Sequence, residues 1–186
     1  MWKKVAIGVG AFVGALVVVL LIAILTRPST YRVERSVTVG ASPEAVYAQV
    51  TDFKKWAVWS PWGKLDPKMK TTFEGTPGAV GSVYTWNGND DVGSGKMTIA
   101  ALDPNKRVDI KLEFYKPFAS TAGNGFLIVP AGKETKVTWF MDGNNDFMGK
   151  AFSLFMDMDK MIGADFEKGL GDMKKIVEAT PSAAAM

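Results

Sequence analysis

Hydrophobic residues run without interruption from residue 5 to residue 25, VAIGVGAFVGALVVVLLIAIL, and no charged side chain occurs among them. A helix of this length rises by roughly 30 Å, which matches the hydrocarbon thickness of a bilayer. The run predicts a single transmembrane helix over 5–25. A cleaved signal peptide is the alternative, but it has a shorter apolar region and ends at a small-residue cleavage site, whereas Leu25-Thr26-Arg27-Pro28 follows here.

The charges that flank this run bear on the orientation of the chain in the membrane. Lys3 and Lys4 precede it, and Arg27, Arg32 and Arg35 follow it. A short lysine-containing N-terminus typically stays in the cytoplasm, so residues 1–4 are expected to form a cytoplasmic stub. The rest of the chain is then expected on the outer side, which is the periplasmic side of the inner membrane in a Gram-negative bacterium.

Gly10 and Gly14 form a GxxxG pair inside the apolar run. Such a pair allows two helix backbones to approach closely, which favours a homodimer through this face. Glycine is also common in membrane helices without any such role, so both interpretations stay open.

After a short linker, 26–30, the pattern changes to alternation. Tyr31 to Val39 alternates and predicts a strand. Ser42-Pro43 then predicts the start of a helix that extends to Val50, and Asp52 predicts the cap of a second short helix that ends at Ser60-Pro61. Even fully extended, the linker spans only about 17 Å, so the domain is expected close to the bilayer.

Turn residues divide the next stretch into short apolar segments. Strands are predicted at 69–74, 82–86, 95–102, 108–114, 118–129 and 133–141. Short turns between successive strands indicate an antiparallel sheet. From Met148 to Ala179 the apolar residues recur every three or four positions, which predicts one long helix, followed by a flexible tail, 180–186. This is an α+β plan in which a curved sheet wraps the final helix and can enclose a cavity.

The composition narrows the chemistry. The sequence contains neither histidine nor cysteine, so disulfides, imidazole bases and the common zinc sites are excluded. No metal and no cofactor is predicted. The formal net charge is +3, and Lys3 and Lys4 account for two of these charges, so no nucleic-acid-binding surface is indicated. Asp157, Asp159 and Asp165 are interpreted as a solvated helix face.

Four motifs carry a family resemblance: WSPW at 59–62, GxxYxWxGN from Gly81 to Asn89, KVTWFMDG at 136–143 and DMDKMIGADFEKGL at 157–170. With the order of elements, they resemble the polyketide cyclase/dehydrase branch of the SRPBCC superfamily, which also contains START lipid-transfer domains. The resemblance covers 31–179. It implies the helix-grip (START-like) fold, whose sheet and C-terminal helix enclose a hydrophobic pocket, but it does not imply one activity.

The aromatic and methionine side chains are the candidates for lining this pocket, since such residues form adaptable apolar sites. The predicted pocket residues are Trp59, Trp62, Tyr84, Trp86, Phe114, Trp139, Phe152, Phe155 and Met156. Trp59 and Trp62 are expected to form a wall or lid at the mouth of the cavity, and Trp56 is expected to pack beneath the sheet. Each of these side chains taken alone is also an ordinary core residue.

Three functions remain open on this reasoning. The first is a membrane-anchored protein that binds, and can transfer, a hydrophobic small molecule or lipid. The second is a protein-interaction module at the membrane. The third is a cyclase-like enzyme, for which Tyr84, Glu113 and Tyr115 are the candidate acid–base groups, although no catalytic constellation is identifiable.

Overall fold

A computed structural model describes residues 2–179 of the chain. Met1 of the predicted stub and the predicted tail, 180–186, lie outside the described residues. The chain divides into two compact units. The larger unit contains Arg32–Gly143 and the residues from Asp159 onward, and the smaller unit contains the residues up to Tyr31 together with Asn144–Met158.

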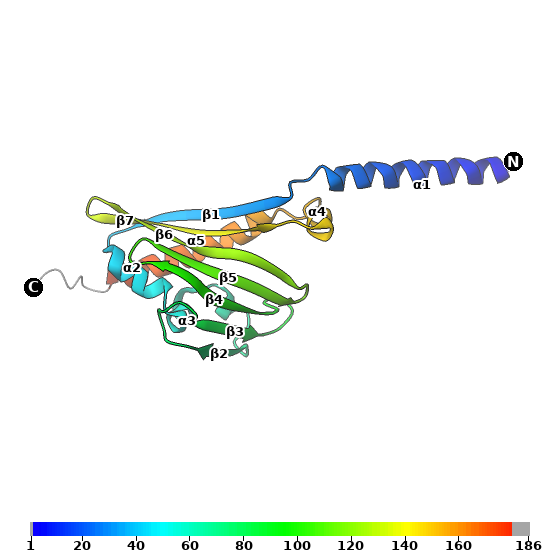
Figure 1. Cartoon of the computed structure of the whole chain (residues 1–186). Helices are drawn as coiled ribbons and strands as arrows, with labels where there is room; N and C mark the ends of the chain where they lie inside the picture. Colours follow the sequence, from blue (N-terminus) through cyan, green and yellow to red (C-terminus); the bar gives the residue numbers. More distant parts are fainter. Residues whose placement is uncertain (1, 180–186) are drawn as a thin grey trace, which may run out of the picture. The chain divides into compact units, whose positions relative to one another are not determined.

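The larger unit is built on a seven-stranded antiparallel sheet in the order β1-β7-β6-β5-β4-β3-β2 (Figure 1). The strands are β1 (Thr30–Val39), β2 (Lys70–Glu74), β3 (Val83–Asn87), β4 (Ser94–Asp103), β5 (Arg107–Lys116), β6 (Ser120–Ala131) and β7 (Glu134–Asn144). All seven predicted strands are confirmed, with ends shifted by at most three residues. Gly93, with φ +62°, lies in the β3–β4 hairpin, as expected of a turn glycine.

The two short helices are α2 (Pro43–Val50) and α3 (Phe53–Trp59), and both begin at the predicted caps. The Ser42 side chain accepts a hydrogen bond from the Ala45 N–H, and the Asp52 side chain accepts one from the Lys54 N–H. Ser60 is extended because it precedes Pro61, which ends α3. A turn of 3-10 helix, η1 (Trp62–Lys64), follows and was not predicted.

The core lies between the inner face of the sheet and helix α5 (Met158–Ala179). α5 presents Phe166, Leu170, Met173 and Val177 to this core, and each is at most 2% exposed. Gly169 lies where α5 closely approaches β7, since a Cβ there would come within 2.8 Å of the Trp139 ring. α5 continues through Gly169 and Gly171, so close packing is the reason for a glycine at 169.

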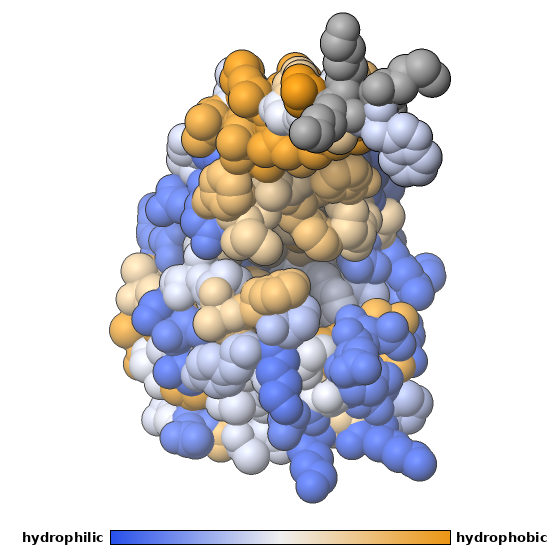
Figure 2. Space-filling model, turned by 90° about the vertical axis from the view of Figure 1, so that its right-hand side faces the viewer, coloured by the Kyte–Doolittle hydropathy of each residue, from blue (hydrophilic) through white to orange (hydrophobic). Residues whose placement is uncertain are grey.

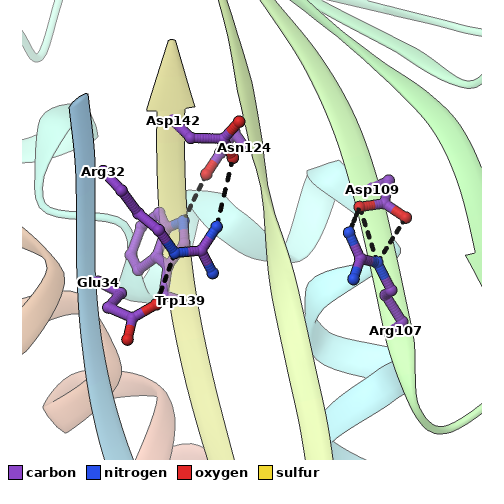
Figure 3. Close-up of polar contacts among 7 residues, drawn as sticks. All are labelled: Arg32, Glu34, Arg107, Asp109, Asn124, Trp139 and Asp142. Carbon is purple, nitrogen blue, oxygen red and sulfur yellow. Dashed lines mark hydrogen bonds and ion pairs between the residues drawn. The ribbon is translucent and has the colours of Figure 1, made fainter. Parts of the chain in front are cut away.

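The outer face of β7 carries Phe140, which is nevertheless 3% exposed. The guanidinium groups of Arg32 and Arg107 lie over its ring, 4.7 and 5.5 Å from its centroid. Arg32 pairs with Glu34 and Asp142, and Arg107 pairs with Asp109 (Figure 3). Paired charges therefore cover the outer face, which leaves the inner face for an apolar site.

The smaller unit contains helix α1 (Trp2–Leu25), the linker that follows it, and helix α4 (Phe147–Phe152). Among the described residues, Ala6–Leu25 is the one helical stretch long and apolar enough to cross a membrane. α1 begins at Trp2, three residues before the predicted start. The Cβ positions of Gly10 and Gly14 have open space around them.

The prediction of one helix from 148 to 179 was wrong. α4 ends at Phe152, the chain then turns, and α5 starts at Met158. The Ser153 hydroxyl donates to the carbonyl of Lys150, and the Met156 N–H donates to the carbonyl of Phe152. The apolar residues that suggested continuity do not form a buried stripe, because Met148 and Phe155 are 66% and 82% exposed.

Candidate ligand-binding site

The three tryptophans of 56–62 reach different depths. Trp56 and Trp59 lie one turn apart on α3 and are 5% and 0% exposed. Trp62, in η1 just beyond Pro61, is half-buried. Trp59 is therefore fully enclosed, and Trp62 is the one of the two predicted lid residues with a surface still open.

Trp139 of β7 is the centre of a first group of rings. Its ring stacks on Phe166 of α5 with centroids 4.3 Å apart and planes 6° apart, and it lies 5.1 Å from Phe126 of β6. The rings of Trp56, Trp59 and Trp62 meet it edge-on at 5.4 to 5.7 Å. Such contacts contribute about 0.5–1.5 kcal/mol each beyond burial, so this group holds α3, η1 and α5 onto the sheet.

The hydrogen bonding of the buried indole N–H groups differs at one tryptophan. The Trp56 N–H donates to the carbonyl of Val50 at 3.0 Å, and the Trp86 N–H donates to the carbonyl of Val92 at 3.0 Å. The Trp139 N–H donates to Oδ1 of Asn124 at 2.8 Å (Figure 3). The Trp59 N–H is buried without a hydrogen-bond partner among the described residues. A buried donor left unpaired costs about 1–3 kcal/mol, so an acceptor at this position would stabilise the protein.

A second group of rings continues along the inner face toward the β2 edge. Tyr84 stacks on Trp86 at 5.9 Å and contacts Phe73 of β2 at 5.3 Å, and Trp86 contacts Phe114 of β5 at 5.9 Å. Tyr84 and Phe114 are half-buried and Phe73 is 39% exposed, so this end of the inner face is incompletely covered.

Phe53 joins the two groups, since its ring lies 5.4 Å from Trp56 and 6.0 Å from Tyr84. We call the whole set the ring network. Its members are Phe53, Trp56, Trp59, Trp62, Phe73, Tyr84, Trp86, Phe114, Phe126, Trp139 and Phe166.

Six of the nine predicted pocket residues belong to the ring network: Trp59, Trp62, Tyr84, Trp86, Phe114 and Trp139. The other three, Phe152, Phe155 and Met156, belong to the smaller unit. There, Phe155 and Met156 line a hollow of about 490 Å³ together with Arg27, Tyr31, Asn145, Ser153, Leu154, Asp157 and Met158. The structure therefore assembles two groups where the sequence predicted one.

Of the titratable groups proposed for catalysis, Tyr84 is partly buried, whereas Glu113 and Tyr115 both lie beside Lys96. Burial raises the pKa of Tyr84, so its hydroxyl stays protonated at neutral pH. Hydrogen bonds from Lys111 and Lys96 lower the pKa of Glu113, so it remains a carboxylate. Tyr115 is 51% exposed. Within residues 2–179, no group of three acidic side chains is arranged to hold a metal ion.

Arg35 of β1 forms ion pairs with α5 that were not predicted from the sequence. Its guanidinium donates to both carboxylate oxygens of Asp159 and, at 2.8 Å, to Glu167, which raises the pKa of Arg35 and lowers that of Asp159. It lies against Gly163, where a side chain would collide with it. Asp159 is solvated, as predicted, with 57% of its side chain exposed, and the ion pair with Arg35 is an additional contact that was not predicted. Two features of the sequence could have indicated this contact. Asp159, Gly163 and Glu167 recur at four-residue steps and so share one helix face, and Arg35 is a charged residue on the otherwise apolar face of its strand.

Comparison with known proteins identifies the family of this chain. Residues 30–178 match the model of the family described as polyketide cyclase / dehydrase and lipid transport. The chain belongs to this family. No curated protein matches the chain significantly.

Several solved structures share the fold. The Zhui aromatase/cyclase from Streptomyces sp. R1128 has 16% identity and a TM-score of 0.59, with 84% of this chain and 98% of that chain covered. A protein from Thermobifida fusca has 18% identity and a TM-score of 0.60, covering 81% and 95%. Major latex-like protein 151 from Panax ginseng has 16% identity and a TM-score of 0.51, covering 82% and 97%. At these identities the likeness shows the helix-grip fold, as the motifs predicted.

Proposed function

We propose that this polyketide cyclase/dehydrase family member binds an apolar small molecule or lipid between the inner face of its sheet and α5. The observation that carries the proposal is the unpaired Nε1–H of Trp59 inside the ring network. An oxygen of a mostly apolar ligand would accept this hydrogen bond, while the rings would bury the remainder of the molecule. The partly exposed rings of Phe73, Tyr84 and Phe114 support entry at the β2 end of the inner face.

The proposal includes anchoring by α1, because Ala6–Leu25 matches the thickness of a bilayer. The lysines at the N-terminus favour the cytoplasmic side for that end, and hence the outer or periplasmic side of a bacterial inner membrane for the sheet domain. A membrane-impermeant thiol reagent tests this with Thr71→Cys, since the native chain has no cysteine. Labelling in intact cells is expected, and labelling only after lysis would overturn the orientation.

Native mass spectrometry of the full chain in detergent, followed by solvent extraction, tests ligand binding. A stoichiometric apolar adduct is expected. Trp59→Phe should then weaken the adduct roughly 2- to 12-fold, the range that corresponds to one hydrogen bond of about 0.5–1.5 kcal/mol. Trp86→Phe is the matched control, because it makes the same change of volume but its N–H is already bound to Val92.

An interaction module at the membrane is the second candidate. The tight stacking of Trp139 on Phe166, with Trp59 fully enclosed, favours it because the interior is filled at this point. A chain that carries no adduct, binds no lipid or fluorescent apolar probe, and co-purifies with a stable protein partner would establish this function in place of ligand binding.

A further inference from the structure

The smaller unit carries an unusual density of exposed apolar side chains on and just after α4. Phe147, Met148 and Phe152 are 50%, 66% and 48% exposed, and Phe155 in the turn beyond is 82% exposed. Leucine-sized and aromatic residues scattered singly on a surface are ordinary, but four within nine residues form a patch that needs a partner. We call this the α4 patch.

The contacts of this segment fix its position relative to the end of α1. α4 packs against α1 within the same unit. The Asn145 N–H donates to the carbonyl of Ser29 at 2.8 Å, and the Asn145 side chain donates to the carbonyl of Pro28 at 3.3 Å. In the last turn of α1, Ile24 is 6% exposed, whereas most other α1 side chains are exposed. The α4 patch therefore begins beside the final apolar turn of α1.

We infer that the α4 patch docks into the surface of the same bilayer that α1 crosses. This inference rests on the membrane anchoring proposed above. A bilayer has about 5–8 Å of headgroup region on each side of its hydrocarbon core, so a helix packed against the last turn of α1 lies at this depth whichever way α1 is oriented. Figure 2 looks at the molecule from the α1 side and shows apolar surface directly next to that helix.

The polar groups of the segment suit an interfacial position. Lys150 of α4 is half-buried, with a long stem that can lie along apolar surface while its ammonium reaches water. Arg27 lies two residues after the apolar run and lines the hollow that Phe155 and Met156 share. Aromatic and methionine side chains together with basic groups are the composition of a helix that lies in the plane of the interface.

The lack of cysteine allows single nitroxide labels to be placed on the full chain in phosphatidylcholine vesicles. Labels at Phe155→Cys, Val17→Cys and Thr71→Cys report the α4 patch, the middle of α1 and exposed strand β2. Accessibility to oxygen, which concentrates in lipid, is compared with accessibility to a water-soluble nickel chelate. The oxygen-to-nickel ratio at 155 is expected to exceed that at 71 several-fold and to be lower than that at 17.

The three labels separate the possible failures. A lipid signal at 17 with a water signal at 155 would leave the anchor standing and overturn the docking of the α4 patch. A water signal at 17 would overturn the anchor and the docking together. Shielding of 155 from both reagents, with spin–spin broadening, would show that a second copy of the chain covers the patch, which also overturns the inference. Ligand binding is read independently by mass spectrometry.

Discussion

Two glycines in α5, two residues apart, should respond oppositely to the same substitution. A Cβ at Gly169 would lie 2.8 Å from Cζ3 of Trp139 and 3.2 Å from Cδ of Pro61. A Cβ at Gly171 would have no atom of the described residues beyond its own helix within 4 Å. Both residues are helical, so alanine brings the same propensity gain of about 1 kcal/mol at each.

The difference between the effects of the two alanine substitutions on the free energy of unfolding therefore measures packing alone. Trp139 is fully buried and stacked on both Phe126 and Phe166, so it has no free direction in which to move. Overpacking of this kind costs about 1–3 kcal/mol. Gly171→Ala is expected to raise the free energy of unfolding by about 1 kcal/mol, and Gly169→Ala to lower it by about 1 kcal/mol after the propensity gain is included.

Thermal unfolding of the full chain in detergent, followed by near-ultraviolet circular dichroism, would measure both variants. The aromatic signal also reports whether the environment of Trp139 changes, which is expected only for Gly169→Ala. Equal stabilisation by the two substitutions would refute the close approach of α5 to Trp139. Destabilisation by both would instead show that the gain in helix propensity does not decide the effect of alanine at Gly171.

Two further predictions concern polar groups. Asn124→Leu removes the acceptor of the buried Trp139 N–H and should lower the free energy of unfolding by about 1–3 kcal/mol. When this substitution is combined with Trp139→Phe, the two losses of stability should not add. Full additivity in unfolding experiments would contradict the hydrogen bond. Lys175 and Lys64 lower the pKa of Asp172 from 3.8 to about 2. The ionised Asp172 should therefore stabilise the fold fully above pH 4, and this contribution should be lost as the pH falls through 2. The contribution is about 1 kcal/mol, because both lysines are solvent-exposed. Asp172→Asn should flatten this part of the pH profile of the melting temperature, and an unchanged acid slope would rule the pairing out.

The strands and short helices could be predicted because their signals are local. Alternation within Tyr31–Val39, the caps at Ser42 and Asp52, and the Ser60-Pro61 stop each act on a few neighbouring residues, and the structure has each of them. The prediction of one continuous helix from 148 to 179 was wrong because the periodicity of apolar residues gives their spacing but not their burial. Phe155 continues the apolar rhythm of α5 in sequence while remaining exposed.

The composition of the candidate site was predictable, but its arrangement was not. Trp59 of α3 and Trp139 of β7 are eighty residues apart in sequence, and they meet because α3 packs on the sheet where Phe126 lies opposite Trp139. No local pattern identifies which indole N–H will lack a partner, because the acceptors lie six residues before Trp56 (Val50), six residues after Trp86 (Val92) and fifteen residues before Trp139 (Asn124). The pairing of Arg35 with α5 depends in the same way on tertiary contacts.

The ring network also determines how the protein will behave optically. Trp56, Trp59, Trp62 and Trp139 lie within 4.8 to 5.7 Å of a neighbouring indole, and Tyr84 stacks on Trp86. At such separations electronic excitation passes from ring to ring faster than it is emitted, so the emission of Trp56, Trp59, Trp62 and Trp139 is coupled. A molecule that quenches or reorients any single ring will thus change the emission and the exciton circular dichroism of the whole set, which makes the unlabelled domain its own reporter.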